Sequence, residues 1–357
     1  MPSPRLLSNG VAGLQPGTSV LVAMSGGVDS SVAAALLKQA GLNVFGAHMI
    51  CWDDCDWKEE RRDALRVALQ LGIPFSSFDF RDGYRERVFD YMIREYAEGK
   101  TPNPDVMCNR EIKFDLFVEK AKELRIDYIA TGHYARLNHD GTRPVLSEAL
   151  DKSKDQSYFL WAVEPRQLSR CLFPLGDYTK EEVRQIARSL SLPTAEKKDS
   201  QGLCFVGKVD FGYFLRGYLP RQEGIVANSR GDVLGKHDGI AFYTIGQRHG
   251  LGIGGRVPYY VAEKKLDTNA LIVGEGADDP VLFKSVIRVH RLNWLSDFRG
   301  GSCDVRIRYR QPRVPAVVEE DNGGVRVVFA KPQRGVAPGQ SAVFYRQERL
   351  LGGGVIL

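Results

Sequence analysis

One short stretch constrains the fold of this chain more than any other: a turn rich in glycine and serine that follows an apolar run. The run Ser19–Ala23 is short and apolar, as buried strands are, and residues 31–38 are strong helix formers. Between them stand Met24-Ser25-Gly26-Gly27-Val28-Asp29-Ser30. Paired glycines allow a tight turn whose N–H groups point inward, serines add hydroxyl donors, and the following helix presents its positive end. The stretch therefore predicts a phosphate-binding turn between a strand and a helix of an α/β fold.

The spacing of this turn excludes two familiar nucleotide-binding motifs. It lacks the lysine and the spacing of GxxxxGK followed by Ser or Thr, and it does not match GxGxxG. The glycine-rich run 246–255 lacks the strand and helix that such a fingerprint needs around it, so it is a weak nucleotide signal. The alternative interpretation of the first turn is a group of small residues that only begins a helix.

The first half of the chain alternates between strand and helix patterns. Apolar runs predict further strands at 43–50, 74–80 and 127–134. Helical patterns stand at 60–69, 84–97 and 113–124. Strands separated by helices predict a doubly wound parallel sheet, whose ligand binds at the carboxyl ends of the strands. Met49, Gly132 and the opening turn all fall at such ends.

The pattern changes after the alternating region, and beyond about Lys208 the runs become shorter and glycine becomes more frequent. Asp140-Gly141 is a hairpin signal within 136–149, and a capping box at Thr179–Glu182 opens a helix that Pro193 ends. From about residue 281 the pattern has period two, as in Val305-Arg306-Ile307-Arg308-Tyr309-Arg310. Such alternation predicts a small barrel or sandwich with one basic wall.

These patterns predict three domains. We expect a catalytic α/β domain at 1–205, a small and mostly β domain at 206–278, and a C-terminal β-barrel-like domain at 279–357. With 357 residues and 43% hydrophobic content, the chain can bury a large core. We expect a cytoplasmic protein, because no segment resembles a membrane span or the apolar core of a signal peptide.

Charge is unevenly placed along the chain. The net charge is +5, yet residues 284–357 hold thirteen Lys and Arg against six Asp and Glu, a balance of +7, which leaves −2 for the remainder. The basic excess in the tail favours binding of a polyanion there. A basic surface that is only solvated is the alternative.

Two cysteines lie in stretches whose sequence indicates a thiol that can ionise. Six irregularly spaced cysteines do not form a disulfide pattern, so reduced thiols are expected. Two prolines stiffen Thr101-Pro102-Asn103-Pro104, so we expect Asp105 and Cys108 on a rigid loop. Arg110, Lys113 and the start of the next helix would lower the pKa of Cys108. An inert buried thiol is the alternative.

The second such cysteine ends a polar loop. Lys197-Lys198-Asp199-Ser200-Gln201-Gly202-Leu203-Cys204 contains glycine and two lysines, so the loop can move and the Cys204 thiol has reason to ionise. Cys51 and Cys55 form a CxxxC pair for which we expect a structural role, as for Cys171 and Cys303. We assign no metal site to these cysteines.

Five blocks, taken in order, resemble the tRNA-specific 2-thiouridylase family of the N-type ATP pyrophosphatase (PP-loop) superfamily. They are AMSGGVDSS, TPNPDVMCNREIKF, TGHYAR, KDQSYFL and KDSQGLCF, and GIAFYTIGQRHGLGI and RIRYRQ extend the match. The resemblance implies a sulfurtransferase that uses ATP to adenylate O2 of the wobble uridine in tRNA. Sulfur from a cysteine persulfide then replaces that oxygen, which yields 2-thiouridine, AMP and pyrophosphate.

The resemblance also implies roles for individual residues. ATP would be held by Ala23, Met24, Ser25, Gly26, Gly27, Val28, Asp29, Ser30, Met49 and Gly132. The target base would lie against Asn103, Pro104 and Asp105. Cys204 would carry the persulfide, and Cys108 would be its partner thiol. Contacts with tRNA are implied for His133, Lys154, Asp155, Gln156, Arg308, Tyr309 and Gln340.

Each step of the implied thiolation has a chemical reason. A carbonyl oxygen leaves poorly, and adenylation converts it to AMP. Cys108 can resolve the persulfide, which leaves a Cys108–Cys204 disulfide bond that a reductant must reopen. Asp105 is placed to act as an acid or a base. The uridine must be flipped out of its stack to reach such a pocket.

The resemblance implies cofactors and partners as well. Mg²⁺ would accompany ATP, and the tRNAs would be those that accept Glu, Gln or Lys. A cysteine desulfurase or a sulfur relay carrier would donate the persulfide, and no membrane partner is expected. A less favoured alternative is an iron–sulfur cluster on Asp105, Cys108 and Cys204, with an unusual oxygen ligand.

Two other functions remain open from the residues alone. A ligase or amidotransferase that adenylates a small molecule could use the same turn, but it would need neither paired cysteines nor a basic β tail. An RNA-binding protein with a structural nucleotide is the other alternative, and it would release no pyrophosphate from ATP in the presence of tRNA.

Overall fold

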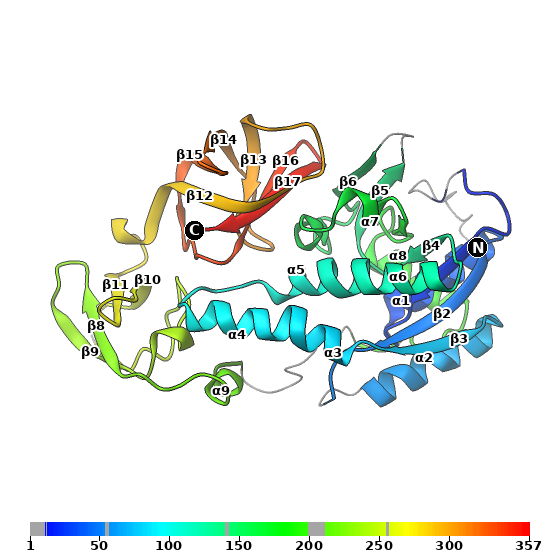
Figure 1. Ribbon diagram of the computed structural model, residues 1–357, viewed down its shortest axis with the longest axis horizontal. Helices are drawn as coiled ribbons and strands as arrows, with labels where there is room; N and C mark the ends of the chain where they lie inside the picture. The colour runs from blue at the N-terminus through cyan, green and yellow to red at the C-terminus, as the bar shows by residue number, and fades with distance from the viewer. Residues whose placement is uncertain (1–10, 12, 54–56, 140–142, 199–210, 255–256) are drawn as a thin grey trace.

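The chain forms three sheets, and all strands of the third except a hairpin at 135–148 follow the other two sheets along the sequence (Figure 1). The computed structural model describes residues 11, 13–53, 57–139, 143–198, 211–254 and 257–357. In these residues the sheets have five, four and eight strands. The described helices include none that is long and apolar enough to cross a membrane.

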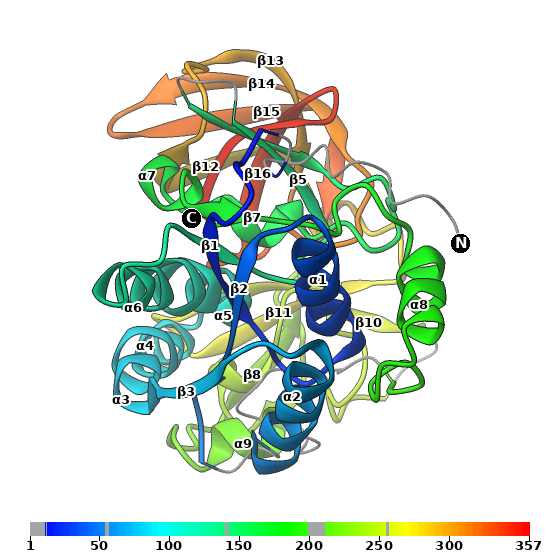
Figure 2. The same ribbon diagram turned by 90° about the vertical axis from the view of Figure 1, so that its right-hand side faces the viewer.

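The first sheet is parallel and has helices on both faces, as the alternating pattern predicts. Its strands are β1 (Ser19–Ala23), β2 (Asn43–Ile50), β3 (Phe75–Asp79), β4 (Tyr128–Ala130) and β7 (Cys171–Leu172), in the order β3-β2-β1-β4-β7. One face is covered by α1 (Val28–Gln39), α2 (Trp57–Leu71) and α8 (Lys180–Ser189) (Figure 2). The order changes direction at β1, which has β2 on one side and β4 on the other. Ligands of doubly wound sheets bind at this switch point.

Two long helical segments cover the other face and extend toward the remaining sheets (Figure 1). The first runs through α3 (Arg81–Tyr84), the π-helix η1 (Arg85–Phe89) and α4 (Asp90–Ala97). The second runs through α5 (Pro104–Cys108), the π-helix η2 (Asn109–Leu116) and α6 (Phe117–Glu123).

The second segment corrects the prediction of a rigid loop, because Asp105 and Cys108 lie inside its first helix. Asn103 is extended, with φ −112° and ψ 91°, and its side-chain oxygen accepts a hydrogen bond from the Val106 N–H at 3.4 Å. The restriction before a proline therefore acts only on the N-cap residue, and Pro104 suits the first helical position.

The second sheet forms a small, mostly β module, as predicted. It contains β8 (Gly224–Asn228), β9 (Val233–His237), β10 (Tyr259–Lys265) and β11 (Ala270–Glu275), in the order β10-β11-β8-β9. A short helix α9 (Phe211–Arg216) precedes it, and the 3₁₀ turns η4 (Ile240–Phe242) and η5 (Pro280–Leu282) lie within and after it.

The third sheet is an antiparallel barrel, and a hairpin from the first half of the chain joins it. The barrel strands are β12 (Phe283–Trp294), β13 (Gly301–Arg306), β14 (Val314–Asp321), β15 (Gly324–Arg334), β16 (Ser341–Arg346) and β17 (Arg349–Ile356). Six strands close because β12 pairs with both β15 and β17. The predicted hairpin is present as β5 (Ala135–His139) and β6 (Pro144–Glu148), and its turn at 140–142 lies outside the described residues. Strand β6 pairs with β17, so the hairpin connects the parallel sheet to the barrel.

The segment between the hairpin and β7 contains two short helical elements. It contains the 3₁₀ turn η3 (Ser157–Leu160) and the helix α7 (Pro165–Leu168). The capping box at Thr179 begins α8, as predicted, with reciprocal hydrogen bonds between Thr179 and Glu182.

The prediction of a basic wall on the barrel is wrong for Arg306. Val305 and Ile307 are buried, as the alternation predicts, but β13 ends at Arg306. The Arg306 guanidinium forms ion pairs with Glu148 at 3.1 Å and Asp155 at 3.2 Å, and both carboxylates are buried. The hairpin and the segment after it cover this side, so Arg306 is a partner within the protein.

The run Gly352-Gly353-Gly354 lets β17 pack against the first domain. A Cβ atom at Gly353 would lie 2.7 Å from Cγ of Trp161 and 3.0 Å from the Ala342 carbonyl oxygen. Trp161 is buried. The absence of a side chain at Gly353 therefore permits the close contact between β17 and Trp161.

We predict that Gly353→Ala lowers the Tm, because the added methyl group overpacks this contact at a cost of roughly 1–3 kcal/mol. Gly254→Ala is the control, since a Cβ atom there meets nothing within 4 Å. Differential scanning fluorimetry of both variants is the measurement. An unchanged Tm for Gly353→Ala would contradict this account of the contact.

Candidate active site

The predicted phosphate-binding turn lies between β1 and α1, and its own side chains hold it closed. Gly26 has φ +74°, and a Cβ atom there would lie 2.2 Å from the Glu60 carbonyl oxygen, so only glycine fits. The Ser25 N–H donates to Ser30 Oγ at 3.2 Å, and that hydroxyl lies 3.2 Å from the Gly27 carbonyl oxygen. Gly27 is the N-cap of α1, and no side chain caps the helix. The N–H groups at this helix start are therefore directed at a site that can take an anion.

The other residues assigned to ATP lie at the same edge of the sheet. Met49 is the penultimate residue of β2, and Gly132 follows β4 by two positions. A Cβ atom at Gly132 would lie 2.8 Å from the Ser30 nitrogen. The backbone after β4 therefore packs directly on the first turn of α1, which brings Gly132 to the phosphate-binding turn.

Two residues that the sequence pattern does not single out hold the carboxylate in this turn. Lys180 Nζ lies 2.7 Å and 2.8 Å from the two carboxylate oxygens of Asp29. The Tyr134 hydroxyl donates to Asp29 Oδ1 at 2.8 Å. The capping box predicts that Lys180 begins a helix, but no sequence signal indicates its partner.

Asp105 and Cys108 lie three positions apart in α5, so they share one face of the helix. Asp105 is exposed at the surface, yet desolvation by the surrounding protein raises its pKa, and the charge of Lys113 partly offsets this effect. Cys108 is 5% exposed and belongs to the same cluster of buried side chains as Ala23, the end of β1. The two side chains are therefore neighbours on α5, with Cys108 buried in the protein and Asp105 accessible to solvent.

The barrel holds the segment that leads into this helix. The Thr101 N–H donates to the Pro338 carbonyl oxygen at 2.8 Å. Gln340 Nε2 donates to the carbonyl oxygens of Thr101 at 2.8 Å and Pro102 at 3.3 Å. Gln340, which the resemblance assigns to tRNA, thus tethers the barrel to the start of the Asp105 helix.

His133 lies in an aromatic environment beside η2. Its Nδ1 is 2.7 Å from the Thr131 hydroxyl oxygen, and its ring lies 5.6 Å and 5.8 Å from the rings of Phe114 and Phe173. Burial lowers the pKa of His133 well below its usual value. The imidazole is therefore neutral at pH 7.

The segment 154–156 lies between the turn and the barrel. Asp155 is buried and accepts hydrogen bonds from the Ala149 and Ser157 N–H groups, besides its ion pair with Arg306. Gln156 Oε1 accepts from the Tyr134 N–H at 2.9 Å. Lys154 is half-buried.

The other two barrel residues assigned to tRNA also have partners inside the protein. The Tyr309 ring packs on Phe159, with ring centroids 4.4 Å apart. Arg308 is half-buried and donates to the Ile245 carbonyl oxygen at 2.7 Å, which connects the barrel to the central module. The structure thus brings Tyr309 against η3, directly after the 154–156 segment.

Cys55 and Cys204 lie outside the described residues. The proximity of Cys204 to Cys108 therefore stays a prediction. Within the described ranges, no group of three His, Cys, Asp or Glu side chains is arranged to hold a metal ion. The alternative iron–sulfur cluster would need Cys204 as a ligand, so it also stays a prediction. Burial raises the pKa of Cys171 well above its usual value, which fits a structural thiol.

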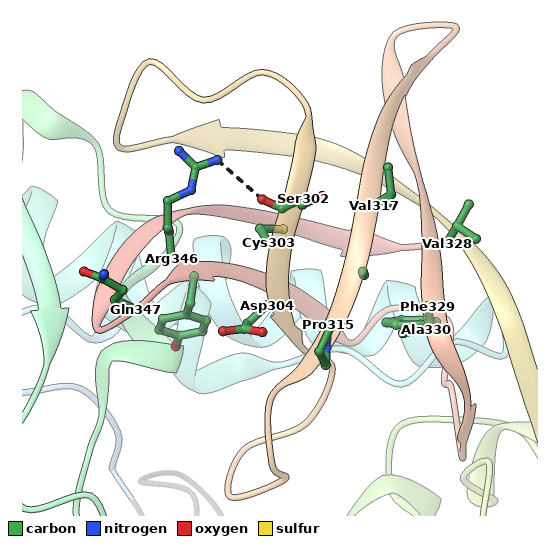
Figure 3. Close-up of a pocket in the computed structure, with 12 residues that line it drawn as sticks. Ser302, Cys303, Asp304, Pro315, Val317, Val328, Phe329, Ala330, Arg346 and Gln347 are labelled. Carbon is green, nitrogen blue, oxygen red and sulfur yellow. Dashed lines mark hydrogen bonds between the residues drawn. The ribbon is translucent and has the colours of Figure 1, made fainter.

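A pocket of about 440 Å³ on the barrel is separate from these residues (Figure 3). It is lined by strands β13 to β16 and includes Cys303, Val317 and Phe329. Burial and the charge of Asp304 raise the pKa of Cys303 to about 12, so this thiol is protonated at pH 7. The pocket therefore presents no activated nucleophile, and none of the residues assigned to ATP or sulfur lines it.

Comparisons with known proteins match domains along almost the whole chain. The tRNA methyl transferase HUP domain matches residues 18–208, the tRNA methyl transferase PRC-barrel domain matches 212–275, and the aminomethyltransferase beta-barrel domain matches 284–356. The chain is 48% identical to tRNA-specific 2-thiouridylase MnmA 2 of Geobacillus kaustophilus over 95% of its length and 94% of the relative. It is 46% identical to tRNA-specific 2-thiouridylase MnmA of Bacillus subtilis, over 95% of both chains.

Among solved structures, the U34-tRNA thiolase NcsA from Methanococcus maripaludis, described with its [4Fe-4S] cluster, is 19% identical. It matches 56% of this chain and 65% of its own, with a TM-score of 0.40. The three matched domains and the near-complete alignments with curated relatives give one result: the chain belongs to the tRNA-specific 2-thiouridylase family.

Proposed function

We propose that this protein is an ATP-dependent tRNA-uridine 2-sulfurtransferase. The observation that carries the proposal is the uncapped start of α1 at the switch point of the parallel sheet, in a chain that belongs to this family. Its product is 2-thiouridine at the wobble position of tRNA, formed with release of AMP and pyrophosphate.

The first step activates the base. O2 of the uridine attacks the α-phosphorus of ATP, the bond to the β-phosphate breaks, and pyrophosphate leaves. The turn from Ala23 to Ser30 holds the phosphates, and Met49 and Gly132 contact the nucleoside. Mg²⁺ would accompany ATP and would supply charge neutralisation at the phosphates. Asp29 does not offer it a vacant ligand, because Lys180 and Tyr134 already bind its carboxylate oxygens.

The second step transfers sulfur. The terminal sulfur of a persulfide on Cys204 attacks C2 of the base, and the C2–O2 bond breaks to release AMP. The Cys108 thiolate then attacks Sγ of Cys204, which breaks the persulfide S–S bond, leaves sulfur on the base and forms a Cys108–Cys204 disulfide. A cellular thiol reductant restores the two thiols. Asp105 accepts the proton that the terminal persulfide sulfur loses as it attacks, because its raised pKa makes it a stronger base than an ordinary carboxylate.

The substrate RNA would contact the protein over two of its domains. We propose that the flipped uridine lies against Asn103, Pro104 and Asp105 at the start of α5, where Asp105 is exposed. The tRNA contacts would be His133, Lys154, Asp155, Gln156, Arg308, Tyr309 and Gln340. Because Asp155 is buried and bonded on several sides, its contribution would be to hold Lys154 and Gln156 in place.

The remaining assignments follow from the family. We propose domain limits of 1–205, 206–278 and 279–357, tRNAs that accept Glu, Gln or Lys, and a cytoplasmic reaction. The persulfide would come from a cysteine desulfurase or a sulfur relay carrier. An iron–sulfur cluster on Asp105, Cys108 and Cys204 is the less favoured alternative.

We predict that Cys108→Ser and Cys204→Ser each abolish sulfur incorporation, while tRNA binding and tRNA-dependent pyrophosphate release persist. The reason is that both thiols act after adenylation. The measurements are mass spectrometry of tRNA nucleosides and a pyrophosphate assay, with ATP and a persulfide donor. Cys303→Ser is the control, because this thiol is protonated and lies on the barrel.

Two results would count against this scheme. Thiolation by Cys204→Ser at the wild-type rate would favour a different sulfur route or a ligase activity. Iron and visible absorbance in anaerobically purified protein would favour the cluster.

We predict that Gly132→Ala reduces pyrophosphate release by about 10- to 100-fold. The added Cβ atom would lie 2.8 Å from the Ser30 nitrogen and 2.9 Å from the Asp29 carbonyl carbon, so the start of α1 must shift. Misplacement of such a site by about 1 Å costs about 100-fold in rate. Gly254→Ala is again the control, and wild-type release by Gly132→Ala would show that the turn does not position ATP.

We predict different effects from two neighbouring arginines. Arg308→Gln should weaken tRNA binding and reduce the slope of log K against log salt by about 1, as expected for a phosphate contact. Arg306→Gln should lower the Tm and leave the slope unchanged, because Arg306 pairs with Glu148 and Asp155. Filter binding at several salt concentrations tests both, and equal slopes for Arg308→Gln and wild type would exclude the proposed contact.

A further inference from the structure

The phosphate-binding turn contains a negative charge where its ligand is itself an anion. Asp29 is the second residue of α1, so its carboxylate lies in the first turn of the helix. A carboxylate there is favourable for the helix itself, because it interacts with the positive end. It is unfavourable for a polyphosphate at the same place, because like charges repel more strongly where protein displaces water. A turn that binds ATP therefore needs a group that offsets Asp29.

Lys180 has the geometry for this role. Its Nζ lies 2.7 Å and 2.8 Å from the two oxygens of Asp29, and its side chain is 12% exposed against 32% for Asp29. The Tyr134 hydroxyl donates to the same carboxylate at 2.8 Å, and Lys180 Nζ lies 5.8 Å from the Tyr134 ring centroid. The capping box between Thr179 and Glu182 determines where α8 begins, which places Lys180 at its first position.

The backbones of both residues are held by one segment, residues 151–156. The Lys180 N–H donates to Asp151 Oδ2 at 3.0 Å. Tyr134 exchanges two hydrogen bonds with Gln156, one to the side-chain oxygen at 2.9 Å and one from the backbone N–H at 2.8 Å. The segment that contains the proposed RNA contacts Lys154 and Gln156 therefore also supports the two residues that hold Asp29.

We propose that Lys180 and Tyr134 are positioning residues for ATP, which neutralise and orient the Asp29 carboxylate so that the phosphate-binding turn accepts a polyphosphate. This inference rests on the proposed function, because it names ATP as the ligand. Lys180 provides the opposing charge, and Tyr134 fixes the orientation of the carboxylate. Segment 151–156 supports both from the side where RNA is proposed to bind.

The test is binding of α,β-methylene-ATP to the full-length protein, without tRNA and with EDTA, so that neither turnover nor Mg²⁺ enters. Lys180→Gln should raise the Kd at least tenfold at low salt, because Asp29 loses its counter-charge. The increase should shrink at 0.5 M salt, where charges are screened. Lys180→Arg should retain most of the affinity, and Tyr134→Phe should raise the Kd by a few-fold.

A second substitution separates charge from structure. Adding Asp29→Asn to Lys180→Gln removes the uncompensated carboxylate, so the double variant should bind the analogue more tightly than Lys180→Gln alone. Arg188→Gln is the matched control, since Arg188 lies in the last turn of the same helix and pairs with Glu196. It should leave the Kd unchanged, and the Tm of each variant shows whether it folds.

The outcomes distinguish this inference from the proposed function. Wild-type affinity in Lys180→Gln, an increase in Kd that salt does not reduce, or no gain from Asp29→Asn would overturn the role of Lys180. Failure of the wild-type protein to bind the analogue would instead count against ATP as the ligand.

Discussion

The close approach of three backbone segments around the start of α1 is the constraint on which the proposed activity depends. Gly26 lies against the Glu60 carbonyl group, and Gly132 lies against the Ser30 nitrogen, with no room for a side chain at either contact. Because these positions lack side chains, α2 and the backbone after β4 pack directly around the turn. The N–H groups at the helix start then converge on one place, at the switch point of the parallel sheet.

The proposed chemistry depends on a second set of contacts, those between the barrel and the first domain. Gln340 and Pro338 hold the backbone at Thr101, directly before the helix that contains Asp105 and Cys108. The β5–β6 hairpin extends the barrel sheet, and Gly353 packs on Trp161. The barrel therefore supports the helix that contains Asp105 and Cys108. Movement of the barrel relative to the sheet would change the position of Asp105.

The ion pairs of the structure change how the basic tail is interpreted. The excess of Lys and Arg in residues 284–357 favours a polyanion, yet Arg306 is paired with Glu148 and Asp155 inside the protein. Arg308 is half-buried and Arg310 is exposed, so the three arginines of one alternating run have different environments. Counting charges thus indicates the class of partner, whereas the contacts indicate which arginines are available to meet it.

The sequence by itself determined the features that depend on neighbours along the chain. The strand, turn and helix at residues 19–39, the alternation of strands and helices, the capping box at Thr179 and the period-two strands follow from local propensity and hydrophobic pattern. Even locally, the prolines at 102 and 104 misled the prediction, because an N-cap and a first helical position satisfy the same restrictions as a loop. Tertiary structure alone decided that Lys180 meets Asp29 across 151 positions and that Arg306 meets Asp155 across 151 positions. The physical reason is that ion pairs and backbone contacts between distant segments depend on how the layers pack, and no periodicity within one segment encodes its partner.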